Sequence, residues 1–360
     1  MIGAAPRLSL AAYGVRGASV SLPSAPLPPA EWRALLHSHA GARLTWPLAQ
    51  AIADGALPAT EAQAGEANLA HHRSLMLDLL LERELLAVTP LLEDAGLTFL
   101  VLKGPAVARL DYPDPAMRSF GDIDLLVPAE QIDELLHVLE SQGGRRRFPE
   151  PRPGYDRRFG KGASVTMPGG HELDVHRTLA PGPYGFTIDL PALFRTAVPF
   201  DLGQTTLTAL GPTERFLHAC LHAILGSAPP KPAALRDVGH LLGTDLEPDV
   251  VTATVAAWGA SAPVALAIRT AVAELALELP SELVSWAAAV EPGARDRRWL
   301  AAYDGRRSSA AQAIEAVRTI DGPRERAAYL RSIVLPRRAP DRNGTMDRWR
   351  RGVRYLWDRG

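Results

Sequence analysis

The sequence is poor in cysteine and in net charge. Its 360 residues include one cysteine, Cys220, so the chain holds no internal disulfide bond and fits a reducing compartment. The formal net charge is −1 and the pI is near 6.8, whereas proteins that bind nucleic acid broadly usually carry a basic domain. These shortages exclude a disulfide scaffold and a uniformly basic nucleic-acid-binding protein, and they leave room for a local basic patch.

Long apolar runs are also missing. No stretch reaches the roughly 18 apolar residues of a membrane-spanning helix. Residues 1–29 are rich in Ala, Pro, Ser and Gly, and they lack the charged start and continuous apolar block of a signal peptide. We therefore expect a cytoplasmic protein with no membrane partner. The hydrophobic content of 47% is ample for packed cores, and the length predicts about two domains.

The most informative stretch is the segment RSFGDIDLLV at 118–127. Read with period two, it is a short strand with Asp122 and Asp124 on one face and apolar residues on the other. Two carboxylates at alternate strand positions lie about 6.6 Å apart and repel each other by about 2.5 kcal/mol at an effective dielectric of about 20. A hard cation such as Mg²⁺ would offset this repulsion. Two solvated acids on an exposed strand are the alternative.

An anion-binding turn precedes this strand. Residues 97–102 form an apolar run typical of a buried strand, and Lys103 and Gly104 lead from it into a short helix over 105–110. The free amides of a helix N-terminus and the helix dipole attract anions, and Lys103 adds a positive charge. Arg118 can reach the same place with a forked pair of donors suited to phosphate. A phosphate site beside two carboxylates suggests a metal-bound polyphosphate.

These motifs resemble the nucleotidyltransferase-like family of uncharacterised bacterial proteins, within the DNA polymerase beta-type nucleotidyltransferase superfamily. The resemblance rests on LKGP at 102–105, on Arg118 and on GDIDLLV at 121–127. It implies a glycine turn at a helix start, an acid-apolar-acid strand and a third carboxylate on a later strand. Here proline follows Gly104 where the superfamily often has a hydroxyl. The gap to Asp122 is longer than is usual in the superfamily, although it fits this family.

The third carboxylate is expected on a hairpin. Residues 163–167 and 171–176 read as two strands joined by Pro-Gly-Gly. Asp174 lies centrally on the polar face of the second strand, and it matches the family pattern of an Asp, an apolar residue and a His. Glu172 is the alternative. His176 is expected to be a structural hydrogen-bond partner, because imidazole prefers softer metals than Mg²⁺.

We predict an α+β fold in which a minimal nucleotidyltransferase core, a small mixed sheet with flanking helices, is joined to N-terminal and C-terminal helical regions. The predicted regions are an irregular N-terminus (1–29), a helical region (30–96), the catalytic core (97–200), a helical C-terminal domain (201–335) and an Arg-rich tail (336–360). The resemblance runs from about residue 30 to the end, while its specific motifs lie between 103 and 176.

Three features outside these motifs are each open to two interpretations. The Arg-rich loop at 143–161 is a solvated loop or an electrostatic lip for a nucleotide or an RNA end. His218 and His222 share a helix face and could bind zinc, but packing histidines are favoured because no glutamate follows His218 as in metalloproteases. Asp237 helps to shape an acceptor pocket or forms a local ion pair. A Leu-rich stripe over 71–92 is expected to pack beside the sheet.

The predicted function is a metal-dependent nucleotidyltransferase that moves a nucleoside monophosphate from an NTP, such as ATP, to an acceptor hydroxyl and releases pyrophosphate. The expected cofactor is Mg²⁺ or Mn²⁺. The predicted catalytic and metal-binding residues are Asp122, Asp124 and Asp174, and the predicted nucleotide-binding residues are Lys103, Gly104, Arg118 and Gly121. A small molecule is the favoured acceptor. The alternatives are nucleotidylation of RNA or of a protein, as in a toxin-like enzyme, and a non-catalytic nucleotide-binding protein that retained the fold.

Overall fold

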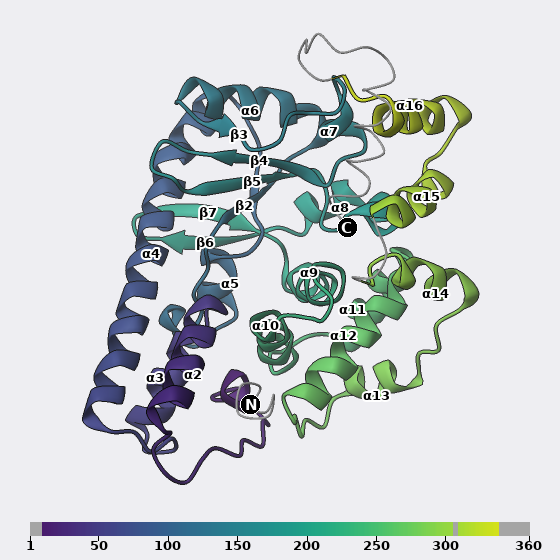
Figure 1. Cartoon of the computed structure of the whole chain (residues 1–360). Coiled ribbons are helices and arrows are strands. Elements are labelled where there is room, and N and C mark those ends of the chain that lie inside the picture. Colours follow the sequence, from purple (N-terminus) through teal and green to yellow (C-terminus); the bar gives the residue numbers. More distant parts are fainter. Residues whose placement is uncertain (1–8, 305–308, 338–360) are drawn as a thin grey trace.

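The computed structural model describes residues 9–304 and 309–337. In this part of the chain a seven-stranded mixed sheet carries helices on both faces (Figure 1). The strands are β1 (Leu100–Val101), β2 (Ile123–Leu126), β3 (Arg145–Arg146), β4 (Gly162–Thr166), β5 (Glu172–His176), β6 (Val198–Leu202) and β7 (Thr205–Ala209). Their spatial order is β3-β4-β5-β2-β1-β7-β6. The predicted α+β class is confirmed.

The elements predicted around the motifs form with small shifts. The strand predicted over 97–102 shortens to β1, and the predicted hairpin forms as β4 and β5. Helix α5 (Pro105–Leu110) begins at the proline as expected, since proline lacks the N–H that a first-turn residue leaves unpaired. After β2 the chain forms the 3₁₀ turn η2 (Ala129–Gln131) and continues as α6 (Ile132–Ser141).

The hairpin of β6 and β7 is absent from the sequence interpretation. Strand β7 pairs in parallel with β1 through Ala209 and Val101, and β6 pairs antiparallel with β7. The sheet therefore continues past residue 200, and the expected boundary of the core falls inside β6. Each strand has five residues, and β6 contains Pro199, a residue that weakens the pattern of a strand.

Three N-terminal helices precede the sheet, and the last of them shares a core with it. They are α2 (Pro29–Gly41), α3 (Thr45–Ala53) and the 34-residue α4 (Glu61–Asp94), which runs along one side of the molecule in Figure 1. Leu85 and Leu92 of α4 are fully buried in the core shared with the sheet, as the Leu-rich stripe predicts. The earlier part of the stripe faces outward, and Leu77 is 59% exposed.

The two faces of the sheet belong to different cores. Ile123 and Leu125 point into one core, together with residues of α4 and α6. Leu126 and Leu102 point to the other face, where they join the helices that follow the sheet. Because strand side chains alternate between faces, Asp124 must lie on the same face as Leu126. The acidic residues therefore face the C-terminal helices.

Beyond β7 the described chain is helical, and α8 (Leu190–Arg195) precedes β6. The helices after β7 are α9 (Pro212–Leu225), α10 (Pro232–Leu242), α11 (Pro248–Ala257), α12 (Ser261–Glu274), α13 (Glu282–Ala289), α14 (Ala294–Ala301), α15 (Ser309–Thr319) and α16 (Pro323–Val334). The remaining short helices are η1 (Pro115–Met117), α7 (Tyr155–Arg158) and η3 (Gly182–Phe186). Most of the predicted Arg-rich tail, 338–360, lies outside the described residues. No helix in 9–304 or 309–337 has both the length and the apolar character needed to cross a membrane.

Candidate active site

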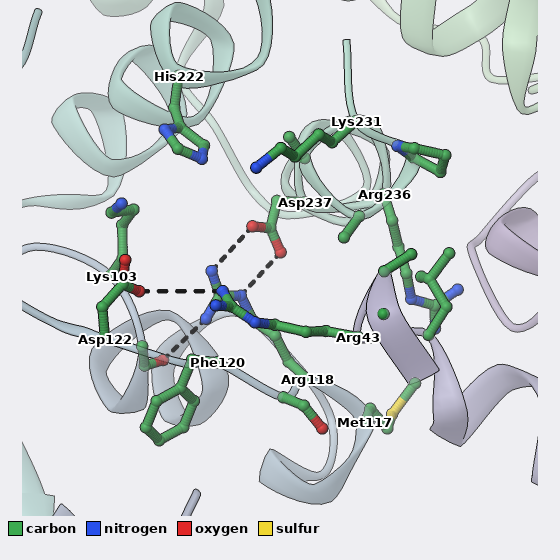
Figure 2. Close-up of a pocket in the computed structure, with 18 of the residues that line it drawn as sticks. Arg43, Lys103, Met117, Arg118, Phe120, Asp122, His222, Lys231, Arg236 and Asp237 are labelled. Carbon is green, nitrogen blue, oxygen red and sulfur yellow. Dashed lines mark hydrogen bonds and ion pairs between the residues drawn. The ribbon is translucent and has the colours of Figure 1, made fainter. Parts of the chain in front are cut away.

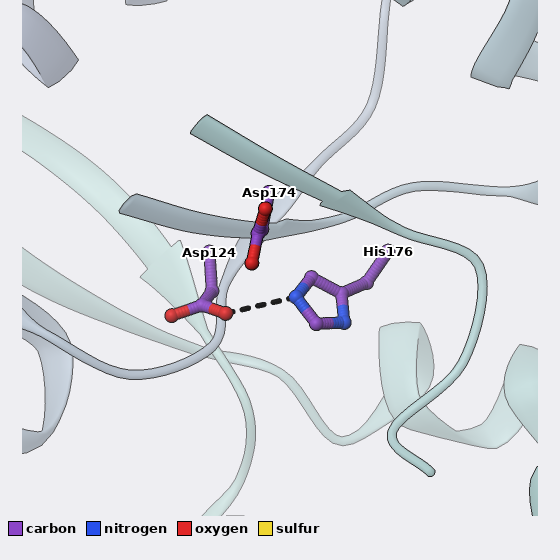
Figure 3. Close-up of side chains that lie close together, drawn as sticks. All are labelled: Asp124, Asp174 and His176. Carbon is purple, nitrogen blue, oxygen red and sulfur yellow. Dashed lines mark hydrogen bonds and ion pairs between the residues drawn. The ribbon is translucent and has the colours of Figure 1, made fainter. Parts of the chain in front are cut away.

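The parallel pairing of β2 with β5 brings two carboxylates together. In this register Asp124 lies opposite Asp174, and His176 follows on the same face of β5. Each of these three side chains offers one atom that could ligate a metal ion, and the three atoms lie within 4.8 Å of one another (Figure 3). We call Asp124, Asp174 and His176 the acid cluster. Since backbone pairing sets the register of the two strands, the sheet itself fixes the position of this cluster.

Asp124 is almost completely buried, with 3% of its surface exposed. Its Oδ1 atom lies 3.0 Å from Lys103 Nζ and 2.8 Å from His176 Nε2. Burial alone would raise the pKa of Asp124, but the charge of Lys103 and the hydrogen bond from His176 hold this pKa well below its usual value. Burial also lowers the pKa of His176. A neutral imidazole that donates from Nε2 therefore meets an ionised carboxylate.

Two buried oxygens of the cluster, Asp124 Oδ2 and Asp174 Oδ1, have no hydrogen-bond partner among the described residues. Such atoms are rare in folded proteins, because an unpaired buried acceptor loses the free energy of hydration. Carboxylate oxygens are the ligands that hard divalent cations such as Mg²⁺ and Mn²⁺ prefer. The donor set of the acid cluster therefore fits a divalent cation.

Asp122 lies near this cluster but in different surroundings. It precedes β2 and is absent from the three-residue acid cluster, and its side chain is one-third exposed. Its nearest cation is Arg43, with 3.9 Å between Oδ1 and Nη1. The sequence interpretation placed Asp122 and Asp124 on one strand face. In the structure Asp122 instead lines a pocket that Asp124 does not reach.

The turn at Gly104 has the backbone geometry that only glycine adopts easily. Its φ is 53° and its ψ is −122°, and a Cβ there would lie 3.3 Å from the ring of Phe120. The turn aims α5 and holds Lys103 beside Asp124. Burial opposes the charge of Lys103, but Asp124 and Asp122 raise its pKa above the usual value. Lys103 is thus a permanent cation at the start of α5.

Arg118 is engaged by the C-terminal helices. Its Nε and Nη2 atoms donate to the two carboxylate oxygens of Asp237 at 2.8 and 2.9 Å, and Nη1 donates to the carbonyl of Gly104 at 3.1 Å. Tyr112 donates a further hydrogen bond of 2.7 Å to Asp237. Burial would raise the pKa of Asp237, but Arg118 lowers it below the usual value. We call residues 118–122, which lead into β2, the acidic loop. The ion pair joins this loop to α10, so Arg118 offers few free donors to a ligand.

A pocket of about 600 Å³ lies between the sheet, α2 and α10 (Figure 2). We call it the cation pocket, because five of its charged lining side chains are basic and two are acidic. The basic residues are Arg43, Lys103, Arg118, Lys231 and Arg236, and the acidic ones are Asp122 and Asp237. Lys103 belongs to both sites, since it lines the pocket and pairs with Asp124. In a chain with a net charge of −1, this local excess of positive charge favours an anionic ligand.

The sequence interpretation did not name Arg43 or Lys231, and it considered His222 only as a packing histidine or a zinc ligand. All three line this pocket. A signal for Lys231 existed, because the chain contains only three lysines, Lys103, Lys161 and Lys231. All three lie around the candidate site. Burial, and then the charge of Lys103, lower the pKa of Lys161, while Asp124 and Asp174 oppose this shift. No comparable signal marks Arg43, because arginine is abundant along the whole chain.

The paired histidines of α9 lie above the site. His222 lines the cation pocket, and His218 is buried with an Nε2 atom that has no partner among the described residues. Burial, followed by the charge of Lys103, lowers the pKa of His222 to about 3 and that of His218 well below its usual value. Both imidazoles are neutral at pH 7. Across 9–304 and 309–337, the potential metal-binding group is the acid cluster, which includes neither histidine.

The Arg-rich loop is largely neutralised by nearby carboxylates. Arg147 pairs with Glu172 at 2.8 Å, and Arg158 pairs with Glu325 of α16 at 2.6 Å. The remaining ion pairs of this loop are Arg146 with Asp156 and Arg157 with Asp133. Glu172, the alternative third carboxylate, is therefore engaged away from the acid cluster. Asp174 is the acid that the structure brings to Asp124.

Comparisons with known proteins show the family of this chain. The family model described as Uncharacterised nucleotidyltransferase matches residues 28–275. Because this span exceeds half of the sequence, the chain belongs to that family. A crystal structure of an antigenic nucleotidyltransferase-like protein from Paracoccidioides brasiliensis is 16% identical, with a TM-score of 0.33, and covers 60% of this chain and 92% of that one. None of the curated proteins compared with the chain matches it.

Proposed function

We propose that the protein is a metal-dependent nucleotidyltransferase that transfers a nucleoside monophosphate from an NTP to an acceptor hydroxyl. The observation that carries the proposal is a pair of carboxylates, the buried Asp124 and the half-buried Asp174, each with one buried oxygen that lacks a partner among the described residues. Lys103 joins this pair to a pocket rich in positive charge. An acidic site needs a cation, and a cationic pocket needs an anion. An NTP with its divalent ion satisfies both requirements at once.

In the proposed reaction the acceptor oxygen forms a bond to the α-phosphorus as the bond from this phosphorus to the bridging oxygen breaks, and pyrophosphate leaves. Asp122, Asp124 and Asp174 would hold Mg²⁺ or Mn²⁺, which when bound would stabilise the attacking and leaving oxygens. Asp174 also receives the proton of the acceptor hydroxyl. It suits this role because, unlike Asp124, it has no ion pair among the described residues.

The nucleotide-binding residues stabilise the leaving group. Lys103 and the amide of Gly104 neutralise charge that develops on the pyrophosphate. Arg118 holds the turn in place by donating a hydrogen bond to the carbonyl of Gly104. The remaining N–H groups of Arg118 can bind phosphate. Gly121 allows close approach at the entrance to β2. We infer that residues 97–200, together with the β6–β7 hairpin at the edge of the sheet, form the catalytic core. The helical regions 30–96 and 201–335 complete the pocket.

The acceptor is proposed to be a small hydroxylated molecule. The arginines of the 143–161 loop, which would have formed an electrostatic lip for RNA, are mostly engaged in ion pairs with neighbouring carboxylates. Surface ion pairs of this kind leave little net charge for polyphosphate binding. This observation favours a small acceptor over an RNA end, and a protein hydroxyl remains the further alternative.

The test is pyrophosphate release from each of the four NTPs with Mg²⁺ or Mn²⁺, using cell extract as the acceptor source. The extract is divided by ultrafiltration so that small and macromolecular acceptors are assayed separately. We expect release with the small-molecule fraction and a loss of about 1,000-fold in Asp124→Asn, because a metal-ligand carboxylate is worth several kcal/mol in the transition state. Asp245→Asn, a change at an exposed acid, is the matched control. Equal turnover by wild type and Asp124→Asn overturns the proposal, and NTP binding without release indicates a non-catalytic nucleotide-binding protein.

A further inference from the structure

Arg43 lies in an unusual position at the mouth of the cation pocket. It follows α2 and has a φ of 58°, in the left-handed region that side-chain-bearing residues seldom adopt. Its guanidinium lies against Gly121, since a Cβ added to Gly121 would be 2.0 Å from Nη2 and 2.4 Å from Cζ of Arg43. The backbone of Gly121 is outside the left-handed region. A side chain at 121 would therefore displace the guanidinium of Arg43 from its place at the pocket.

The guanidinium of Arg43 keeps most of its donors available. The side chain is 47% exposed, and its one ion pair in the described chain is the long contact of 3.9 Å with Asp122. A guanidinium carries five N–H donors in a planar fork that matches phosphate. Figure 2 shows Arg43 reaching into the pocket beside Asp122 and Phe120. Arg43 is thus a charged group placed at the site and left free to bind an anion.

Lys231 enters the same pocket from the start of α10 (Figure 2). No carboxylate of residues 9–304 or 309–337 pairs with it. The other basic residues of the pocket are engaged: Lys103 pairs with Asp124, Arg118 with Asp237, and Arg236 donates to the carbonyls of Ala11 and Tyr13. The two uncommitted cations therefore come from opposite helical regions, and neither comes from the sheet.

Resting on the proposed function, we propose that Arg43 and Lys231 bind the terminal phosphates of the nucleotide. Both residues line the pocket with Asp122, whereas Asp124 and Asp174 do not line it. If the reacting α-phosphate lies at the acid cluster, the β- and γ-phosphates extend into the cation pocket. The most negative part of the nucleotide would then meet Lys231, which has no ion pair among the described residues, and Arg43, whose ion pair is the long contact with Asp122. Phosphate recognition would depend on both flanking helical regions.

The first test uses inorganic tripolyphosphate as the probe, because it requires no knowledge of the base. Calorimetry on the full chain should show tripolyphosphate binding in wild type. Arg43→Gln and Lys231→Gln should each weaken this binding about 10- to 100-fold, as expected for a charge-assisted hydrogen bond. Arg33→Gln removes the same charge from an exposed position of α2 and should bind as wild type. Failure of wild type to bind, or wild-type affinity in both pocket variants, overturns the proposal.

The second test joins Arg43 to Gly121. Gly121→Ala should weaken tripolyphosphate binding about as much as Arg43→Gln, because the new methyl group displaces the guanidinium. In the Arg43→Gln background the same change should cause no further loss, so that the two effects are not additive. A full additional loss in the double variant contradicts the proposed link between the two residues.

These outcomes separate this inference from the proposed function. Weakened tripolyphosphate binding in the variants, with no pyrophosphate release from any NTP, would support the phosphate contacts and reject the transferase. Unchanged binding in the variants, with release that depends on Asp124, would support the transferase and reject the roles of Arg43 and Lys231.

Discussion

The acid cluster and the cation pocket adjoin each other, yet they are built in different ways. The acid cluster comes from two neighbouring strands, and the pairing of Asp124 with Asp174 follows from the register of β2 and β5. The cation pocket gathers Arg43 from the N-terminal helices and Lys231 and Asp237 from α10. Its firmest link is an ion pair between Arg118 and Asp237, which are 119 residues apart in sequence.

This difference separates two tasks. A sheet holds side chains at spacings set by backbone hydrogen bonds, which suits carboxylates that must share a cation. Helices packed against the sheet carry side chains whose positions depend on how the helices dock, which suits the recognition of a particular ligand. Lys103 connects the two sites, since it pairs with Asp124 and lines the pocket. The acid cluster is thus placed by the register of paired strands, and the cation pocket by the docking of helices.

The largest loss of stability is expected on breaking the ion pair between Arg118 and Asp237, which joins α10 to the loop before β2. Asp237→Ala leaves the buried guanidinium of Arg118 without its carboxylate, and we expect the free energy of unfolding to fall by about 3–5 kcal/mol. Urea unfolding measures this change. Asp245→Ala, at an exposed acid, should stay within about 0.5 kcal/mol of wild type. A loss below about 1 kcal/mol in Asp237→Ala would show that the ion pair does not hold the pocket to the sheet.

Metal binding should stabilise the protein through the acid cluster. At a free Mn²⁺ concentration of about 100 times its dissociation constant, the free energy of unfolding should rise by about 2.7 kcal/mol, because the ion binds the folded state. A chelator should reverse the gain. Asp174→Asn removes one of the two unsatisfied oxygens and should lose most of the stabilisation, while Asp245→Asn keeps it. Equal stabilisation of Asp174→Asn and wild type would place the ion elsewhere.

The stability of the protein should depend on pH through Asp78, which holds the acidic loop against α4. Asp78 of α4 accepts a hydrogen bond of 2.9 Å from the amide of Phe120, and its burial raises its pKa from 3.8 to about 6. The folded state therefore binds this proton more tightly than the unfolded state between pH 3.8 and 6. Stability is highest with Asp78 protonated, and the free energy of unfolding should fall as the pH rises through this range, by about 2 kcal/mol between pH 4.5 and 7.5.

Asp78→Asn removes this titration, so the variant should lose about 2 kcal/mol less than wild type over the same pH range. Urea unfolding at the two pH values gives the difference. Burial also raises the pKa of Asp156 to about 6. Because Asp156 titrates in both proteins, its contribution to the pH dependence cancels in the difference. Identical pH dependence in the two proteins would refute the assignment to Asp78.

The smallest effect is expected at the glycine turn between the two sites. Gly104→Ala forces a methyl group into a backbone conformation that favours glycine and against the ring of Phe120. Gly55→Ala is the matched control, because Gly55 has a φ of 70° but no atom within 4 Å of its added Cβ. We expect Gly104→Ala to be less stable than Gly55→Ala by about 1 kcal/mol. Equal stability would mean that Phe120 does not restrict the turn.

The two carboxylates of the acid cluster could each be proposed from a local pattern. Alternation along 123–127 places Asp124 opposite the apolar face, and the Pro-Gly-Gly hairpin predicts the strand that carries Asp174. The pairing of these two strands, whose acids are 50 residues apart, comes from the tertiary structure. The position of Asp122 was not predictable in the same way, because β2 starts one residue after it. The short strands β6 and β7 also escaped the sequence interpretation, since five residues with a proline carry little pattern.

The sequence by itself determined the α+β class, the glycine turn, the two acids and the family to which the chain belongs. These follow from periodicity and from motifs whose residues are close in sequence. Tertiary structure alone decided that Arg43 would lie against Gly121, that Arg118 would be held by Asp237, and that Lys231 would remain free. Such contacts depend on how helices far apart in the chain dock on the sheet, and no local pattern of residues specifies that docking.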